Sequence, residues 1–100
     1  MFGNIMEQMQ EQAEEIKKKL DKTILEGTAE NNLVKVKVTG NKKIISVDIS
    51  DKIANDKEAI EDLIIVATNK AIEKAEKVAE KETGSMAKGI LPNLGGMFGK

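Results

Sequence analysis

Apolar residues recur along the first quarter of the chain with the spacing of an α-helix. The steps between them are four, four, three and four residues, at Ile5, Met9, Ala13, Ile16 and Leu20. This spacing places them on one stripe of a helix, and the residues between them are mostly Glu, Gln and Lys, which favour helix. Asn4 and Glu7 have the spacing of a capping box. The pattern predicts an amphipathic helix that begins near Asn4 and packs on a core through this stripe.

The middle of the chain changes to the alternation that is typical of strands. Residues 33–39 alternate valines with lysines, and residues 43–50 alternate three apolar positions with polar ones, namely Ile45, Val47 and Ile49. The Gly-Asn pair at residues 40–41 supplies a short turn, so the two runs predict a hairpin with one buried face. Residues 23–29 contain β-branched residues and Gly27, which suggests a further short strand with a bulge.

A second, longer helix is expected after the hairpin. Asn55 and Glu58 repeat the capping spacing, and the helical pattern continues to about Glu82, where Gly84 follows as a helix-ending residue. Within this helix four consecutive apolar residues point all the way round, because each residue is rotated by about 100° from the last. A helix that is apolar on every side is buried on every side. We therefore expect these four to meet both the chain's own sheet and the partner of a homodimer: Leu63, Ile64, Ile65 and Val66.

The sequence predicts one domain over residues 1–84 and a mobile tail over residues 85–100. The tail holds the only proline and four of the eight glycines, and it has no periodic apolar pattern to bury. The order of elements is α-β-β-β-α, which gives an α+β fold with a small antiparallel sheet and two long helices. A chain of 100 residues buries a limited core, which favours an oligomer.

The composition excludes most enzyme chemistry. The chain has no Cys, His, Tyr or Trp, so the usual proton shuttles and nucleophiles are missing. Asp48, Asp51 and Asp56 do not form a calcium loop, since the sixth position would be Asp56 rather than glycine. No glycine-rich phosphate loop follows a strand. We therefore expect no enzyme activity, metal, cofactor or small-molecule substrate. The sequence also shows no apolar run of about 18 residues and no export signal, so we expect a cytoplasmic protein without membrane association.

Charge is segregated on the second helix. All sixteen basic residues are lysines and the net charge is -1, so the charge of the whole chain does not favour a polyanionic partner. Four lysines are nevertheless spaced by four, three and four residues, within about 60° of one another: Lys70, Lys74, Lys77 and Lys81. Glu73, Glu76 and Glu80 form a neighbouring acidic stripe. The lysine stripe suits either a row of phosphate contacts or the charged rim of an ordinary amphipathic helix.

Three consecutive lysines near the end of the first helix do not form a single patch. They fan out over about 200°, and Glu14 and Glu15 stand four residues before the second and third of them, in the favourable direction for ion pairs. The lysines also suit the negative end of the helix dipole. Together with one further lysine they are secondary candidates for phosphate contacts: Lys17, Lys18, Lys19 and Lys22.

Nearly the whole chain resembles the YbaB/EbfC family of bacterial nucleoid-associated proteins. The similar segments are the opening MFGN before a Met/Gln/Glu-rich helix, the hairpin LVKVKVTGNKKIISVDIS, the helix segment DKEAIEDLIIVATNKAIEKA and the ending GILPNLGGMFGK. One departure is Asn32, where the family usually has glycine. The resemblance rests on the order and spacing of these segments together.

The resemblance implies a small cytoplasmic homodimer, intertwined and tweezer-like, in which long helices project from a shared core. It also implies binding of double-stranded DNA in the nucleoid, for chromosome organisation or gene regulation, with contacts on the two long helices. Lys74 matches a position that is basic in related sequences. Because the chain lacks arginine, which reads guanine best, DNA binding is expected to be largely independent of sequence and to go through phosphates.

A second hypothesis belongs to a different class of function. The chain could serve as a dimeric protein-interaction or scaffold module, in which the apolar tail makes the contact and DNA binding is incidental. The slightly negative net charge and the interspersed carboxylates favour this alternative, whereas the family resemblance and the lysine stripe favour DNA binding.

Overall fold

The order of elements agrees with the sequence prediction. The computed structural model describes residues 2–90, and the side chains of residues 4–84 within them. Its elements are α1 (Phe2–Lys22), β1 (Ile24–Ala29), β2 (Val34–Thr39), β3 (Ile44–Ile49), the 3-10 turn η1 (Asp51–Ile53) and α2 (Lys57–Ile90). The strands form one antiparallel sheet in the order β1-β2-β3. The predicted α+β fold is therefore confirmed.

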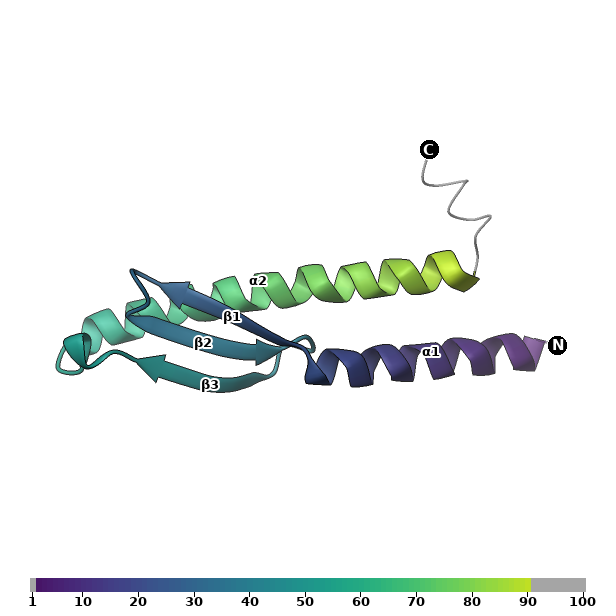
Figure 1. The fold of residues 1–100 in the computed structure, drawn as a ribbon, viewed down its shortest axis with the longest axis horizontal. Helices are drawn as coiled ribbons and strands as arrows, with labels where there is room; N and C mark the ends of the chain where they lie inside the picture. Colours follow the sequence, from purple (N-terminus) through teal and green to yellow (C-terminus); the bar gives the residue numbers. More distant parts are fainter. Residues whose placement is uncertain (1, 91–100) are drawn as a thin grey trace, which may run out of the picture.

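The two helices project from one end of the sheet. The first half of α2 lies across one face of the sheet, and its second half continues beyond the strands beside α1 (Figure 1). The two helices run in opposite directions, since α1 enters the sheet and α2 leaves it. The charged side chains are therefore carried by a sheet and by two antiparallel helices that extend beyond it.

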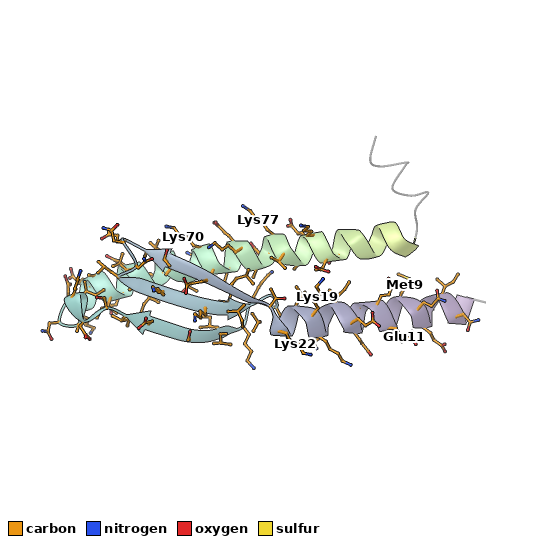
Figure 2. All side chains as sticks on the ribbon, in the orientation of Figure 1. Met9, Glu11, Lys19, Lys22, Lys70 and Lys77 are labelled. Atoms are coloured by element: carbon orange, nitrogen blue, oxygen red, sulfur yellow. The ribbon has the colours of Figure 1, made fainter. Side chains whose placement is uncertain are left out.

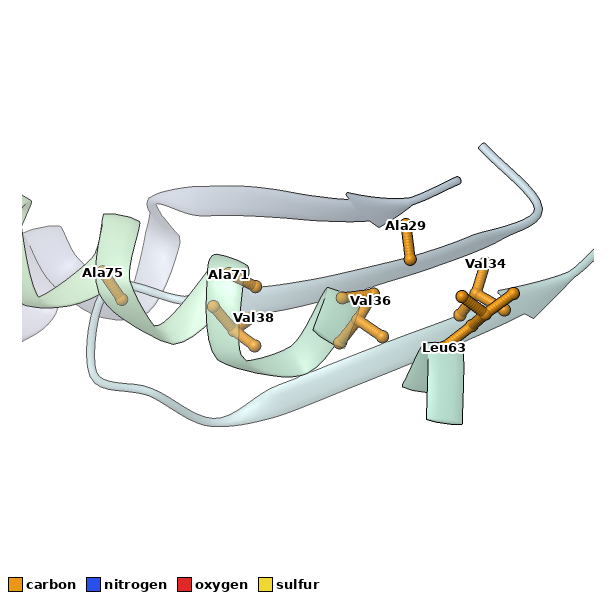
Figure 3. Close-up of a cluster of buried hydrophobic side chains, with 8 residues drawn as sticks. Ala29, Val34, Val36, Val38, Leu63, Ala71 and Ala75 are labelled. Carbon is orange, nitrogen blue, oxygen red and sulfur yellow. The ribbon is translucent and has the colours of Figure 1, made fainter. Parts of the chain in front are cut away.

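The core lies between α2 and the first two strands (Figure 3). Its buried side chains are Ala29, Val34, Val36, Val38, Leu63, Ala67, Ala71 and Ala75. Alanines at every fourth position give α2 a face without bulk, so the helix backbone comes close to β1. A Cβ atom on Gly27 would lie 2.1 Å from the Ala67 carbonyl oxygen. Gly27 therefore serves this close approach, and the bulge predicted there is wrong, because β1 pairs with β2 in unbroken register.

The irregularity in the sheet lies instead between β2 and β3. The register pairs Lys37 with Ser46 but Val38 with Ile44, so Ile45 is the extra residue. The register thus brings Ile44 opposite a buried valine and interrupts the predicted alternation at Ile45.

Strand β3 is largely exposed, which corrects the expectation that the hairpin has one fully buried face. Ile45 and Val47 are 47% and 45% exposed, and only Ile49 is half-buried. The reason is geometric: a helix about 10 Å across covers roughly two strands that are about 4.8 Å apart. Helix α2 packs on β1 and β2 and leaves the third strand uncovered.

Helix α1 packs on the rest of the chain only at its C-terminal end, so the prediction that its whole apolar stripe is buried is also wrong. Leu20 is buried and Ile16 is half-buried, whereas Ile5 and Met9 are 49% and 41% exposed. The turn after β2 fixes this end, because the Gly40 amide donates to the Leu20 carbonyl oxygen at 2.9 Å. A Cβ atom on Gly40 would lie 2.8 Å from the Leu20 Cδ2 atom, so a larger residue would push the helix away.

The ends of the helices differ from the prediction by a few residues. Helix α1 begins at Phe2, so Asn4 lies inside it. Helix α2 is capped by Asp56 rather than Asn55, since the Asp56 carboxylate accepts from the Ala59 amide at 3.1 Å. Its other end is at Ile90 rather than near Glu82. A glycine inside a helix costs only about 1 kcal/mol, and no proline stands before residue 92, so α2 continues through Gly84. Of the predicted tail, residues 91–100 lie outside the described residues.

Candidate nucleic-acid interface

The four lysines of the stripe on α2 are all exposed. They lie on the flank of the helix beside β1, where the Lys74 Nζ atom donates to the Glu26 carbonyl oxygen at 2.7 Å. Figure 2 shows Lys70 and Lys77 on the side of α2 that is turned away from α1. The predicted stripe is therefore a feature of the folded surface, running from the sheet onto the projecting half of α2.

None of these four lysines has an acidic partner among the described side chains. The ion pairs of residues 4–84 join Lys19 to Glu82 at 3.0 Å and Lys42 to Glu76 at 3.5 Å. Neither pair involves a lysine of the stripe. The acidic stripe beside the lysines thus does not neutralise them by direct contact, and at least one of its members, Glu76, pairs with a lysine of the β2–β3 turn.

The lysines of α1 lie apart from the stripe. Lys19 pairs across to Glu82 of α2, which corrects the predicted pairing with Glu15 four residues earlier. Lys17, Lys18 and Lys22 are exposed. In Figure 2, Lys22 lies on the side of α1 that is turned away from α2, whereas Lys70 lies on the side of α2 that is turned away from α1. Within one chain, the structure does not combine the two groups of lysines into a single surface.

The four apolar residues predicted to meet a partner differ in their exposure to solvent. Leu63 is 8% exposed and belongs to the chain's own core, and Ile64 packs against that core. Ile65 and Val66 are 59% and 41% exposed. The sequence predicts burial on every side of the helix here, and within one chain only the side of Leu63 and Ile64 is covered.

Strand β3 carries an exposed apolar surface, where the sequence predicts a buried face. The register places Ile44, Val47 and Ile49 opposite the buried valines of β2, on the face of the sheet that α2 occupies. Ile65 and Ile72 extend this surface. On a helix they fall within about 40° of Glu76, whose contact with Lys42 places that side of α2 next to the β2–β3 turn. We call these five residues the inner β3 surface. Its signal in the sequence was the alternation of β3, but periodicity alone does not say what covers a strand.

The described part of the chain offers no metal site or membrane span. Across residues 2–90, no three acidic side chains gather in a way that could hold a metal ion, and neither helix contains a stretch apolar enough to cross a bilayer. The exposed charges and the inner β3 surface are therefore the features that a function can be built on.

Comparison with known proteins identifies relatives that match this chain over most of their own length. Residues 2–90 match the model of the YbaB/EbfC DNA-binding family. A nucleoid-associated protein of Flavobacterium johnsoniae is 38% identical over 97 residues, which cover 97% of this chain and 91% of that protein. One from Neisseria meningitidis serogroup C is 41% identical over 104 aligned residues, covering 97% and 94%.

A similar fold is known from a crystal structure. An uncharacterized protein from Helicobacter pylori superimposes with a TM-score of 0.79 over 85% of this chain and 91% of that one. Its sequence identity is 21%, so this likeness concerns the fold alone.

Proposed function

The chain belongs to the YbaB/EbfC DNA-binding family, and we propose that it binds double-stranded DNA in the nucleoid as a homodimer, through the phosphates. Family membership and the names of the relatives indicate a DNA-binding nucleoid-associated protein rather than an enzyme. Chromosome organisation or gene regulation is the role that fits such binding.

The observation that carries the proposal is the lysine stripe on α2. Lys70, Lys77 and Lys81 are exposed and make no ion pair with a described side chain. From Lys70 to Lys81 the stripe is about 16 Å long. This length spans several phosphates of one DNA strand, which follow one another at roughly 3.4 Å along the axis of the duplex. Lysine meets phosphate as a point charge, without the planar fork by which arginine reads bases. The stripe therefore supports binding to the DNA backbone with little sequence preference.

The inner β3 surface supports the proposed homodimer. Its residues Ile44, Val47 and Ile65 are 51%, 45% and 59% exposed, although Ile44 and Val47 stand opposite buried valines of β2 in the sheet. A two-fold axis would bring the same surface of a second copy against it, burying apolar side chains that one helix is too narrow to cover. A dimer also doubles the number of lysines that face DNA, which strengthens binding that depends on phosphates.

A charge reversal on the stripe tests this function. We expect Lys70→Glu with Lys77→Glu to weaken binding to unrelated duplexes alike, at least tenfold at about 0.1 M salt, because both changes oppose phosphate contacts. The matched control is Lys37→Glu with Lys43→Glu, the same charge change at two exposed lysines of the sheet region, which should weaken binding much less. If the stripe variant is folded and dimeric yet binds as the parent does, the scaffold alternative becomes the better account.

A further inference from the structure

Lys74 differs from the other lysines of the stripe because its side chain makes a hydrogen bond to the backbone of the same chain. Among the side-chain hydrogen bonds of the described residues, its Nζ atom donates to the Glu26 carbonyl oxygen at 2.7 Å, while Lys70, Lys77 and Lys81 make none. Glu26 and Lys74 are 48 residues apart in sequence. The bond therefore joins two elements, the long helix and the first strand.

The bond lies where helix and strand are closest. Gly27 follows Glu26, and a Cβ atom there would lie 2.1 Å from the Ala67 carbonyl oxygen and 2.5 Å from the Ala71 amide nitrogen. Lys74 stands one turn beyond this contact, between the buried Ala71 and Ala75. The same close packing that requires glycine in β1 thus brings the Lys74 ammonium group to the strand backbone.

Strand β1 is an edge of the sheet, since the strand order is β1-β2-β3. One side of an edge strand has backbone groups without a neighbouring strand, and a lysine placed there hinders pairing with another chain. Lys74 donates to a backbone carbonyl of this strand and places a positive charge beside it.

We infer that Lys74 is a positioning residue: it fastens α2 to β1, so that Lys70 and Lys77 on either side of it are held toward DNA, and it is not itself a phosphate contact. The inference rests on the proposed function, since it assigns different roles within the same stripe. Its physical basis is that one ammonium donor is already engaged and the side chain is directed to the strand, whereas the neighbouring lysines have no protein partner among the described residues.

Three variants separate positioning from charge. Lys74→Met keeps the length of the side chain but removes the donor and the charge; Lys74→Arg keeps both; Lys77→Met removes only an exposed charge. Each full-length protein is compared with the parent in hydrogen exchange of the β1 and α2 amides, and in its affinity for one DNA duplex across a series of salt concentrations.

We expect Lys74→Met to speed exchange in β1 about three- to tenfold, as for the loss of one hydrogen bond. The DNA affinity of this variant should also fall, by a factor that does not change with salt concentration. The log–log slope of affinity against salt therefore stays as in the parent. Lys74→Arg should restore both. Lys77→Met should leave exchange unchanged and reduce the slope by about 0.9 for each phosphate that is no longer neutralised, or about 1.8 for a dimer.

Two results would overturn the inference. One is a salt slope for Lys74→Met that flattens as it does for Lys77→Met, because Lys74 would then neutralise a phosphate. The other is unchanged exchange in β1, because the bond would then hold nothing in place. Failure of the proposed function looks different: the parent itself would show no salt-dependent DNA binding, whatever the exchange data report.

Discussion

Replacing Gly27 by alanine should destabilise the fold, although the same change usually stabilises a helix or strand. The new Cβ atom would meet the Ala67 carbonyl oxygen at 2.1 Å and the Ala71 amide nitrogen at 2.5 Å, where ordinary contacts begin at 3.4 Å. Helix α2 and strand β1 must therefore separate by roughly 1 Å, because the obstacles are backbone atoms that cannot rotate away.

The magnitude follows from this overlap. Overpacking of a well-packed core costs about 1–3 kcal/mol, and the reduced freedom of the unfolded chain returns about 0.4–1 kcal/mol for a glycine-to-alanine change. We expect the upper part of the range to apply, with a net loss of about 1–2.5 kcal/mol. For a domain of this size that corresponds to a fall in Tm of roughly 5–20 °C.

Thermal unfolding followed by circular dichroism measures this effect, with parent and variants at one protein concentration, since the stability of a dimer depends on concentration. Gly84→Ala is the matched control. Gly84 lies inside α2 and nothing stands within 4 Å of the position of its added Cβ, so this variant should gain about 0.5–1 kcal/mol. The reasoning is refuted if Gly27→Ala melts at or above the parent temperature, because α2 would then not lie so close to β1.

Two further expectations concern the dimer and the tail. Val47→Asp should convert the proposed dimer to a monomer or unfold it, since it buries an unpaired charge in the inner β3 surface. Sedimentation equilibrium measures the mass, and Ser46→Asp at the neighbouring exposed position is the control. A parent mass of 10.9 kDa at micromolar concentration would refute the dimer itself. Of the predicted tail, we expect residues 91–100 not to be needed for folding: their deletion should leave Tm within about 4 °C, equivalent to less than about 1 kcal/mol, and a larger fall would mean that these residues stabilise the domain.

The sequence was sufficient for features that depend on periodicity. A period of two located β2 and β3, and a helical period located both helices and the lysine stripe, because side-chain direction follows from spacing alone. The family resemblance likewise led to the family that the comparison with known sequences shows. The dimer and the roles of the lysines remain proposals.

Features that depend on contacts between distant residues could not be read in this way. Gly27 looked like a bulge because its neighbour in space, Ala67, is 40 positions away. Lys19 was matched with Glu15 by local spacing, whereas Glu82 reaches it through the fold. The exposure of β3 depends on how many strands α2 covers, which no local pattern encodes.

The predicted helix boundaries differ from the structure for another reason. Asn55 and Asp56 are both good capping residues, and the structure uses the second. Gly84 is a common stop signal, but its cost of about 1 kcal/mol is too small to end a helix when Met86, Ala87 and Lys88, which favour helix, follow it. Such choices rest on small energy differences, so spacing rules place an end only to within a few residues.

A salt titration of DNA binding tests the central claim most directly. The parent protein is titrated against two unrelated duplexes of equal length between about 50 and 200 mM salt, the range over which phosphate contacts weaken steeply. With four to six phosphates neutralised by a dimer, we expect both duplexes to give nearly equal affinities and a log–log slope of about -4 to -5, at roughly -0.9 per phosphate. A slope shallower than about -1, or strong binding to one duplex only, would contradict binding through the lysine stripe.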